Sequence, residues 1–197
     1  NEQIGMKMNV TRVVPSFDPA ERPEDNFRLR ESLELYEEQQ NVQSGRVKID
    51  FSIHAEYTSD YRLWEAMSEY CINEGLRMHI HLSETKREHD ECKERYGLTP
   101  AQVLDCHHVF DMPGAAAHWL EPEDMALLAK RKISAVHNPC SNLKLASGCA
   151  KVEDMIRAGM NVCLGTDSSA SNNNLDMFEE IRAATYMAKG VSRNPKA

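Results

Sequence analysis

The stretch AVHNPCSNLKLASG, residues 135–148, ends an apolar run on a histidine and continues as a polar loop. Similar short apolar runs occupy residues 6–14, 47–53, 77–82, 114–118, 133–137 and 161–166. Between the runs lie segments with helical spacing of their apolar residues, for instance 25–40 and 59–74. This alternation of strand and helix patterns predicts an α/β fold with a parallel sheet and helical crossovers.

Two architectures compete for this pattern, an open doubly wound sheet and a (β/α)8 TIM barrel. The open nucleotide-binding sheet calls for a glycine-rich turn after its first strand, and the chain has none there. A barrel needs eight strand–helix units and roughly 250 residues, whereas this chain has 197. We therefore expect a single partial barrel domain, residues 1–197, that covers about strands 3 to 8.

The composition argues against several classes of binding partner. The net charge of −8 argues against nucleic acid or an anionic membrane as the main partner, because both attract basic surfaces. No apolar run approaches the roughly 20 residues of a membrane helix, and the first residues lack a signal-peptide pattern. The six cysteines form no CxxC pair. We expect a cytoplasmic protein with reduced thiols that acts on a small molecule.

The predicted strands share one feature, which is an ionisable side chain at or just after their last residue. These side chains are His54, His81 with Glu84 beyond it, His118, His137 and Asp167. The carboxyl ends of parallel barrel strands open onto one face, where active sites form. A single strand-end histidine is more often structural, but this series suits a mononuclear site for Zn²⁺ or Fe²⁺. Glu84 lies three residues past His81 and is placed to carry protons without being a ligand.

A further pair of potential ligands lies on a predicted helix. His89 and Cys92 could chelate from one helix face, but the surrounding KREHDECKER run, residues 86–95, is highly charged. A solvated helix face is the favoured interpretation of that run.

Three motifs carry a resemblance to a known family. HIHLSET (79–85), HNPCSNLKLASG (137–148) and LGTDSSASNNNLDMFEEIRAA (164–184) together resemble the amidohydrolase superfamily. The most similar branch contains the S-adenosylhomocysteine/5′-methylthioadenosine deaminases, with cytosine, guanine and triazine hydrolases nearby. The resemblance extends along essentially the whole chain.

The resemblance implies roles for particular residues. His81 and Asp167 would bind one divalent metal ion, Zn²⁺ in preference to Fe²⁺. Glu84 would be the proton shuttle, and His118 would lie beside the metal-bound water. His54 and His137 would contact the substrate. Arg12 and Arg28 would hold the carboxylate tail of S-adenosylhomocysteine.

The implied reaction is hydrolytic deamination of a purine nucleoside derivative: S-adenosylhomocysteine, 5′-methylthioadenosine or adenosine. The metal lowers the pKa of its water, Asp167 accepts a proton, Glu84 protonates the ring nitrogen, and ammonia leaves. One alternative is a triazine or free-base amidohydrolase or chlorohydrolase. Another is a catalytically incomplete barrel fragment without the family's first-strand His-x-His pair. Such a fragment would expose sheet edges and self-associate, for instance as a homo-oligomer.

Overall fold

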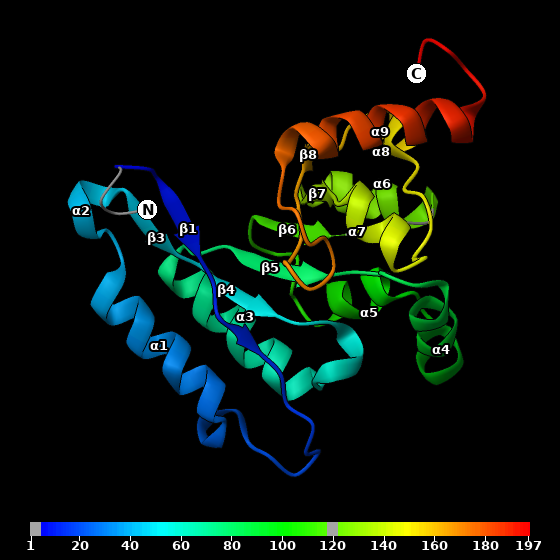
Figure 1. Ribbon diagram of the computed structural model, residues 1–197. Coiled ribbons are helices and arrows are strands. Elements are labelled where there is room, and N and C mark those ends of the chain that lie inside the picture. Colours follow the sequence, from blue (N-terminus) through cyan, green and yellow to red (C-terminus); the bar gives the residue numbers. More distant parts are fainter. Residues whose placement is uncertain (1–4, 118–121) are drawn as a thin grey trace. The chain divides into compact units, whose positions relative to one another are not determined.

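The computed structural model describes residues 5–117 and 122–197 (Figure 1). The chain divides into two compact units. Unit 1 runs to Ile80 and includes Leu104–Pro113, and unit 2 comprises His81–Val103 and Gly114–Ala197. The expectation of a single partial barrel domain stays a prediction.

Unit 1 contains two groups of parallel strands. In the first, β1 (Met8–Val10) pairs with β3 (Val47–Ile49). In the second, β4 (Phe51–Ile53) pairs on one side with β2 (Val13–Val14) and on the other with β5 (Met78–His81), whose last residue belongs to unit 2. The parallel strands that we predicted are confirmed, but the runs 6–14 and 47–53 each form two short strands rather than one.

Asp50 gives the physical reason for the second split. This residue lies between β3 and β4, where the chain changes its pairing partner from β1 to β2. Its carboxylate is 7% exposed, forms an ion pair with Arg77 Nε at 3.1 Å and accepts a hydrogen bond from the Asn9 side-chain amide. Aspartate is a poor strand residue, and here its side chain binds groups from neighbouring segments instead of continuing a regular strand.

The helices of unit 1 cover its strands. They are η2 (Pro23–Asp25), α1 (Phe27–Gln39), α2 (Val42–Gly45), η3 (Glu56–Thr58) and α3 (Tyr61–Glu74). A fourth α-helix, α5 (Pro100–Cys106), begins in unit 2 and ends in unit 1. The Asn26 side chain accepts a hydrogen bond from Leu29 N and so caps the start of α1. The helical spacing of apolar residues in 59–74 is confirmed by α3, whose Leu63 and Met67 are both buried.

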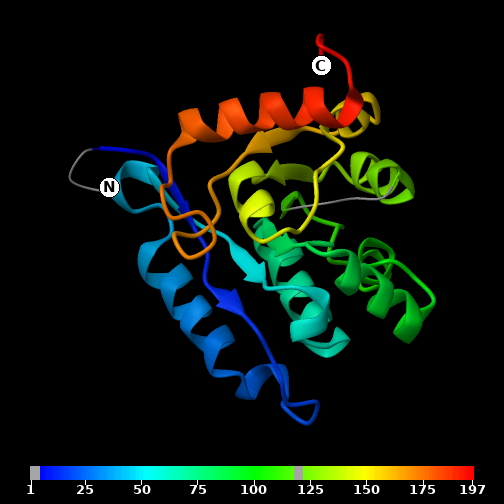
Figure 2. The same ribbon diagram turned by 45° about the vertical axis from the view of Figure 1, so that its right-hand side comes forward.

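In unit 2 the strands β6 (Gly114–Ala117), β7 (Ser134–His137) and β8 (Val162–Leu164) are parallel neighbours in that order. The helices of this unit are α4 (Lys86–Tyr96), α6 (Pro122–Lys130), α7 (Pro139–Lys144), α8 (Val152–Arg157) and α9 (Met177–Ser192). Helix α9 lies beside β8 and α7 (Figures 1 and 2). The register pairs His137 with Leu164, so β7 and β8 end at the same level of the sheet.

Helix α4 corrects one expectation. His89 and Cys92 are 5% and 0% exposed, so the interpretation of this helix face as solvated is wrong for both residues. Most charged residues of the run lie on the opposite side of the helix, as in the exposed pairs Lys86–Asp90 and Arg87–Glu91, although Glu88 is buried. A highly charged helix can therefore still bury one narrow face.

These elements establish an α/β fold in which parallel strands alternate with helices, as the sequence predicted. In the part of the chain that is described, no helix has both the length and the apolar character needed to cross a membrane.

Candidate functional site

The first element of the candidate site is the loop after β5. His81 is the last residue of that strand, and Glu84 follows in a loop whose Ser83 has a left-handed φ of 52°. The buried carboxylate of Glu88 accepts hydrogen bonds from the backbone N–H of Ser83 at 3.0 Å and of Glu84 at 2.8 Å. The Thr85 side chain in turn caps α4 by accepting from Glu88 N. The backbone that carries Glu84 is therefore held in place by the helix that follows it.

The second element is the loop after β8. Asp167 is half-buried and adopts a left-handed φ of 60°, a conformation that aspartate tolerates better than most residues. Its Oδ1 accepts a hydrogen bond from Ser168 N at 2.7 Å, and its Oδ2 accepts one from Ser141 Oγ at 2.5 Å. Ser141 is fully buried on α7. The carboxylate of Asp167 is thus oriented by donors from two separate segments.

A close approach between β7 and the end of β8 makes the contact of Ser141 with Asp167 possible. Gly165 N donates to His137 O at 3.0 Å, which continues the pairing of the two strands. A Cβ atom at Gly165 would lie 2.5 Å from Asn138 Oδ1 and 2.9 Å from Val136 Cγ1. Only glycine fits here without movement of its neighbours, because those distances are shorter than normal van der Waals contact.

Behind these loops lies a buried carboxylate on α9, Glu180. It accepts a hydrogen bond from Cys140 N at 3.1 Å and is fully buried. Burial, together with the hydrogen bond and charge of Glu180, raises the pKa of the Cys140 thiol to about 11. The thiol is therefore protonated near neutral pH and is not poised as a nucleophile.

Three predicted substrate-binding residues lie in unit 1. Arg12 and Arg28 meet at one carboxylate oxygen, Glu31 Oε2, at 2.5 and 3.0 Å. The buried Arg12 Nε has no hydrogen-bond partner among the described residues. His54 directly follows β4, and its ring stands perpendicular to that of Tyr57 with centroids 6.3 Å apart. The structure therefore brings the two predicted arginines together, although residues 13–27 separate them in the sequence.

The predicted metal ligands fit such a site by type but do not complete it. His81 and Asp167, both in unit 2, offer an imidazole and a carboxylate, which are common zinc ligands. Within residues 5–117 and 122–197, no group of three or more His, Cys, Asp or Glu side chains is arranged to hold a metal ion. His118, predicted to lie beside the metal-bound water, is outside the described residues. A catalytic zinc site normally has three protein ligands, so these two residues are a partial set.

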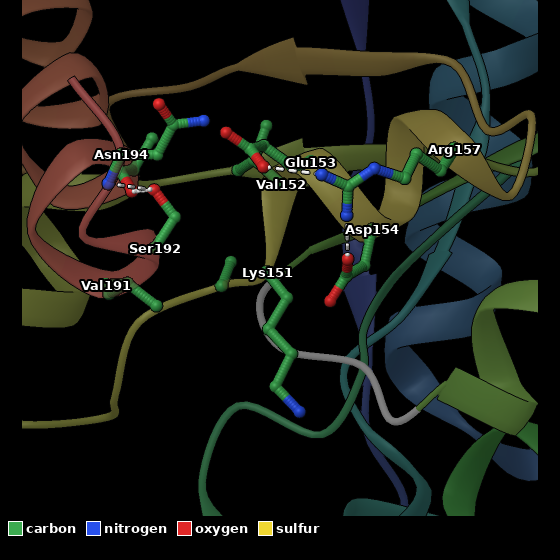
Figure 3. Close-up of a pocket in the computed structure, with 10 residues that line it drawn as sticks. Lys151, Val152, Glu153, Asp154, Arg157, Val191, Ser192 and Asn194 are labelled. Atoms are coloured by element: carbon green, nitrogen blue, oxygen red, sulfur yellow. Dashed lines mark hydrogen bonds and ion pairs between the residues drawn. The ribbon is translucent and has the colours of Figure 1, made fainter. Parts of the chain in front are cut away.

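A cavity of about 440 Å³ lies elsewhere in unit 2, between α8 and the end of α9 (Figure 3). None of the predicted site residues lines it. Arg157 points between Glu153 and Asp154 and pairs with both, at 2.8 and 2.7 Å.

Several residues that shape the candidate site were not predicted. Ser141 and Glu180 lie inside two of the quoted motifs, but neither spacing nor residue type indicates that they contact the loops after β7 and β8. Glu88 could have been found, because Thr85 and Glu88 have the spacing of a capping box.

Comparisons with known proteins give a consistent result. Residues 2–197 match the family described as "Amidohydrolase family". The chain is 41% identical over 195 residues to a 5-methylthioadenosine/S-adenosylhomocysteine deaminase of Caldanaerobacter subterraneus, which covers 98% of this chain and 45% of the relative. A protein with the same name from Thermococcus sibiricus is 39% identical over 98% of this chain and 46% of its own length. The chain thus spans about half the length of the curated relatives that it matches.

A solved structure extends the comparison to three dimensions. An adenosine deaminase from Xanthomonas campestris with bound zinc is 33% identical, with a TM-score of 0.89 over 100% of this chain and 45% of the other. The partial coverage agrees with the expectation that the chain corresponds to part of such a fold.

Proposed function

The chain belongs to the amidohydrolase family, and we propose that it serves the hydrolytic deamination of a purine nucleoside derivative such as S-adenosylhomocysteine, 5′-methylthioadenosine or adenosine. The observation that carries this proposal is the 41% identity to a named deaminase over 98% of the chain. The order of side chains at the strand ends supports it, because His81 and His137 are the last residues of β5 and β7.

The proposed chemistry assigns His81 and Asp167 as two ligands of one divalent cation, with Zn²⁺ preferred over Fe²⁺. Bound there, the cation would lower the pKa of a water molecule. Asp167 accepts the proton of the attacking water, whose oxygen bonds to the amino-bearing ring carbon. Glu84 delivers a proton to the ring nitrogen, and Asp167 passes the water proton to the amino group, which leaves as ammonia. The new hydroxyl returns its proton to Glu84 as the carbonyl forms. The hydrogen bonds from Ser83 and Glu84 to Glu88 support this role, since they restrict the loop that carries Glu84.

The remaining predicted residues are assigned to substrate binding. His54 and His137 would contact the nucleoside, and His118 would polarise the nucleophile. Arg12 and Arg28 would hold an anionic tail, and their shared contact with Glu31 supports a joint role. Two guanidinium groups at one place favour a substrate with a carboxylate over a free base or a triazine. A cytoplasmic location and a homo-oligomeric state stay predictions.

Metal content and ammonia release together test the proposal. The purified 197-residue chain is analysed for bound zinc and iron and assayed with the three nucleosides, beside Asp167→Asn. The control is Asp90→Asn, which makes the same change at an exposed carboxylate of α4. We expect about one metal ion per chain, lost only in Asp167→Asn, together with ammonia release.

Two results would count against the proposal. Bound metal without ammonia release from any of the three nucleosides would contradict the deaminase assignment. Absence of bound metal would contradict the idea that this chain alone carries a working site, and would favour the incomplete-fragment alternative.

A further inference from the structure

Glu180 is a buried ionisable group that the proposed reaction does not use directly. Its carboxylate is 0% exposed and lies in the first turn of α9, within unit 2. Burying a carboxylate is costly unless its oxygens are hydrogen-bonded. Here each oxygen has a donor from a different segment: Oε2 accepts from Cys140 N on α7, and Oε1 accepts from the side-chain amide of Asn172 in the loop after β8.

Asn172 extends the connection toward Asp167. Its amide nitrogen also donates to Thr166 O at 2.7 Å, one residue before Asp167. Its amide oxygen accepts from Asn174 N at 3.2 Å and Leu175 N at 3.3 Å. The amide thus fixes both ends of the loop between β8 and α9, and its orientation is determined because each side has a defined partner.

On the other side, Glu180 holds the start of α7. Cys140 is the second residue of that helix, and Ser141, which donates to Asp167, is the next one. One carboxylate therefore connects the segment that provides the donor with the segment that provides the acceptor.

We propose that Glu180 is a positioning residue that fixes the loops after β7 and β8 relative to each other and so sets the hydrogen bond between Ser141 and Asp167. The inference rests on the proposed function in that it takes Asp167 to be a metal ligand. Partners that orient a ligand typically change metal affinity 10–100-fold when they are removed.

The chemistry of the contact explains why a carboxylate is needed. Both oxygens of Glu180 accept, and they face the N–H of Cys140 and the NH₂ of Asn172. A glutamine at position 180 would keep the shape of the side chain but replace one acceptor oxygen with an NH₂ donor. This NH₂ would then face another donor, either the N–H of Cys140 or the NH₂ of Asn172. Asn172 cannot rotate its amide to compensate, because its oxygen is already held by two backbone N–H groups.

The test compares Glu180→Gln with Glu123→Gln, which makes the same charge change at an exposed glutamate of α6. Amide hydrogen exchange is measured without metal on peptides that cover residues 139–145 and 166–175. We expect roughly tenfold faster exchange in both peptides for Glu180→Gln, with no change in the peptides of α4 and α6. Affinity for Zn²⁺ alone, measured by competition with a chromophoric chelator, should fall about 10–100-fold. Glu123→Gln should leave both measurements unchanged.

A double variant separates positioning from general destabilisation. In Glu180→Gln combined with Asn172→Asp, the new amide at position 180 can donate to the new carboxylate at position 172. This restores the link between α9 and the loop but not the bond to Thr166 O. Exchange in both peptides should then be slower than in Glu180→Gln alone. If Glu180→Gln does not fold, Asn172→Ala replaces it, and faster exchange confined to residues 166–175 is expected.

The outcomes distinguish this inference from the proposed function. Unchanged exchange in both loops of Glu180→Gln, or a double variant no better than the single one, overturns the positioning role. If the unmodified chain binds no Zn²⁺ but the exchange results are as expected, Glu180 positions α7 and the loop after β8, and the idea that this chain alone holds the metal is wrong.

Discussion

Ser141 Oγ donates a hydrogen bond of 2.5 Å to Asp167 Oδ2, and this bond joins helix α7 to the loop after β8. The hydroxyl is fully buried, whereas Asp167 is half-buried. A hydrogen bond to a charged oxygen is stronger than one between neutral groups, and it directs the carboxylate. The other oxygen of Asp167 is held by the backbone N–H of Ser168.

Removal of this hydroxyl should weaken metal binding. In Ser141→Ala the carboxylate of Asp167 loses its donor from α7, and we expect affinity for Zn²⁺ to fall about 10–100-fold. Competition with a chromophoric chelator measures the change. Ser169→Ala, which alters an exposed serine of the loop after β8, is the matched control. Equal affinity of Ser141→Ala and the unmodified chain would show that the hydroxyl does not orient a ligand.

Gly165 should not tolerate a methyl group. In Gly165→Ala the new Cβ would lie 2.5 Å from Asn138 Oδ1. We expect the free energy of unfolding, measured in urea, to decrease by about 1–3 kcal/mol. Gly190→Ala makes the same change inside α9, where a Cβ would meet nothing within 4 Å. In that control the free energy of unfolding should increase by about 0.5–1 kcal/mol, because alanine favours the helix more than glycine does. A neutral or stabilising Gly165→Ala would mean that β7 and the end of β8 lie further apart than described.

Arg28 should contribute to the binding only of substrates that carry a carboxylate tail. If it binds a carboxylate, Arg28→Ala should weaken S-adenosylhomocysteine binding by about tenfold or more, the loss expected for a charged hydrogen bond. Binding of 5′-methylthioadenosine, which lacks the carboxylate, should stay the same. Calorimetric titration with both ligands gives the comparison. Arg30→Ala removes an exposed positive charge from the same helix as a control. Equal weakening of both ligands by Arg28→Ala would exclude a role in tail recognition.

Alkaline pH should destabilise the fold through Cys71. Burial raises the pKa of this thiol from 9.0 to about 12. The unfolded thiol ionises first, so the stability due to Cys71 is complete below pH 9 and is lost as the pH rises toward 12. The free energy of unfolding, measured in urea, should therefore fall as the pH is raised from 8 to 11. This decrease with pH should be smaller in Cys71→Ala. It should be unchanged in Cys106→Ala, which removes an exposed thiol. A slope that is the same in all three proteins would contradict this assignment.

Strand ends were the most predictable part of the site. Apolar runs with a terminal histidine indicated where β5 and β7 stop, and His81 and His137 are indeed their last residues. This information is local, because a strand ends where its apolar pattern gives way to polar residues.

The contacts between loops were not predictable in the same way. Ser141 and Asp167 are 26 positions apart, and Cys140 and Glu180 are 40 apart. Their pairing depends on which strands become neighbours, and no periodicity encodes that. The burial of His89 and Cys92 on a charged helix was missed for the same reason, since the packing partner decides which face is covered.

The close approach at Gly165 also has a consequence for how this protein can change over evolutionary time. A larger residue at position 165 needs the space now filled by Asn138 and Val136. Such a substitution becomes acceptable only after a smaller residue has replaced one of these neighbours. In a collection of natural variants, positions 136, 138 and 165 should therefore change together, and exchanges of single residues at 165 should be rare.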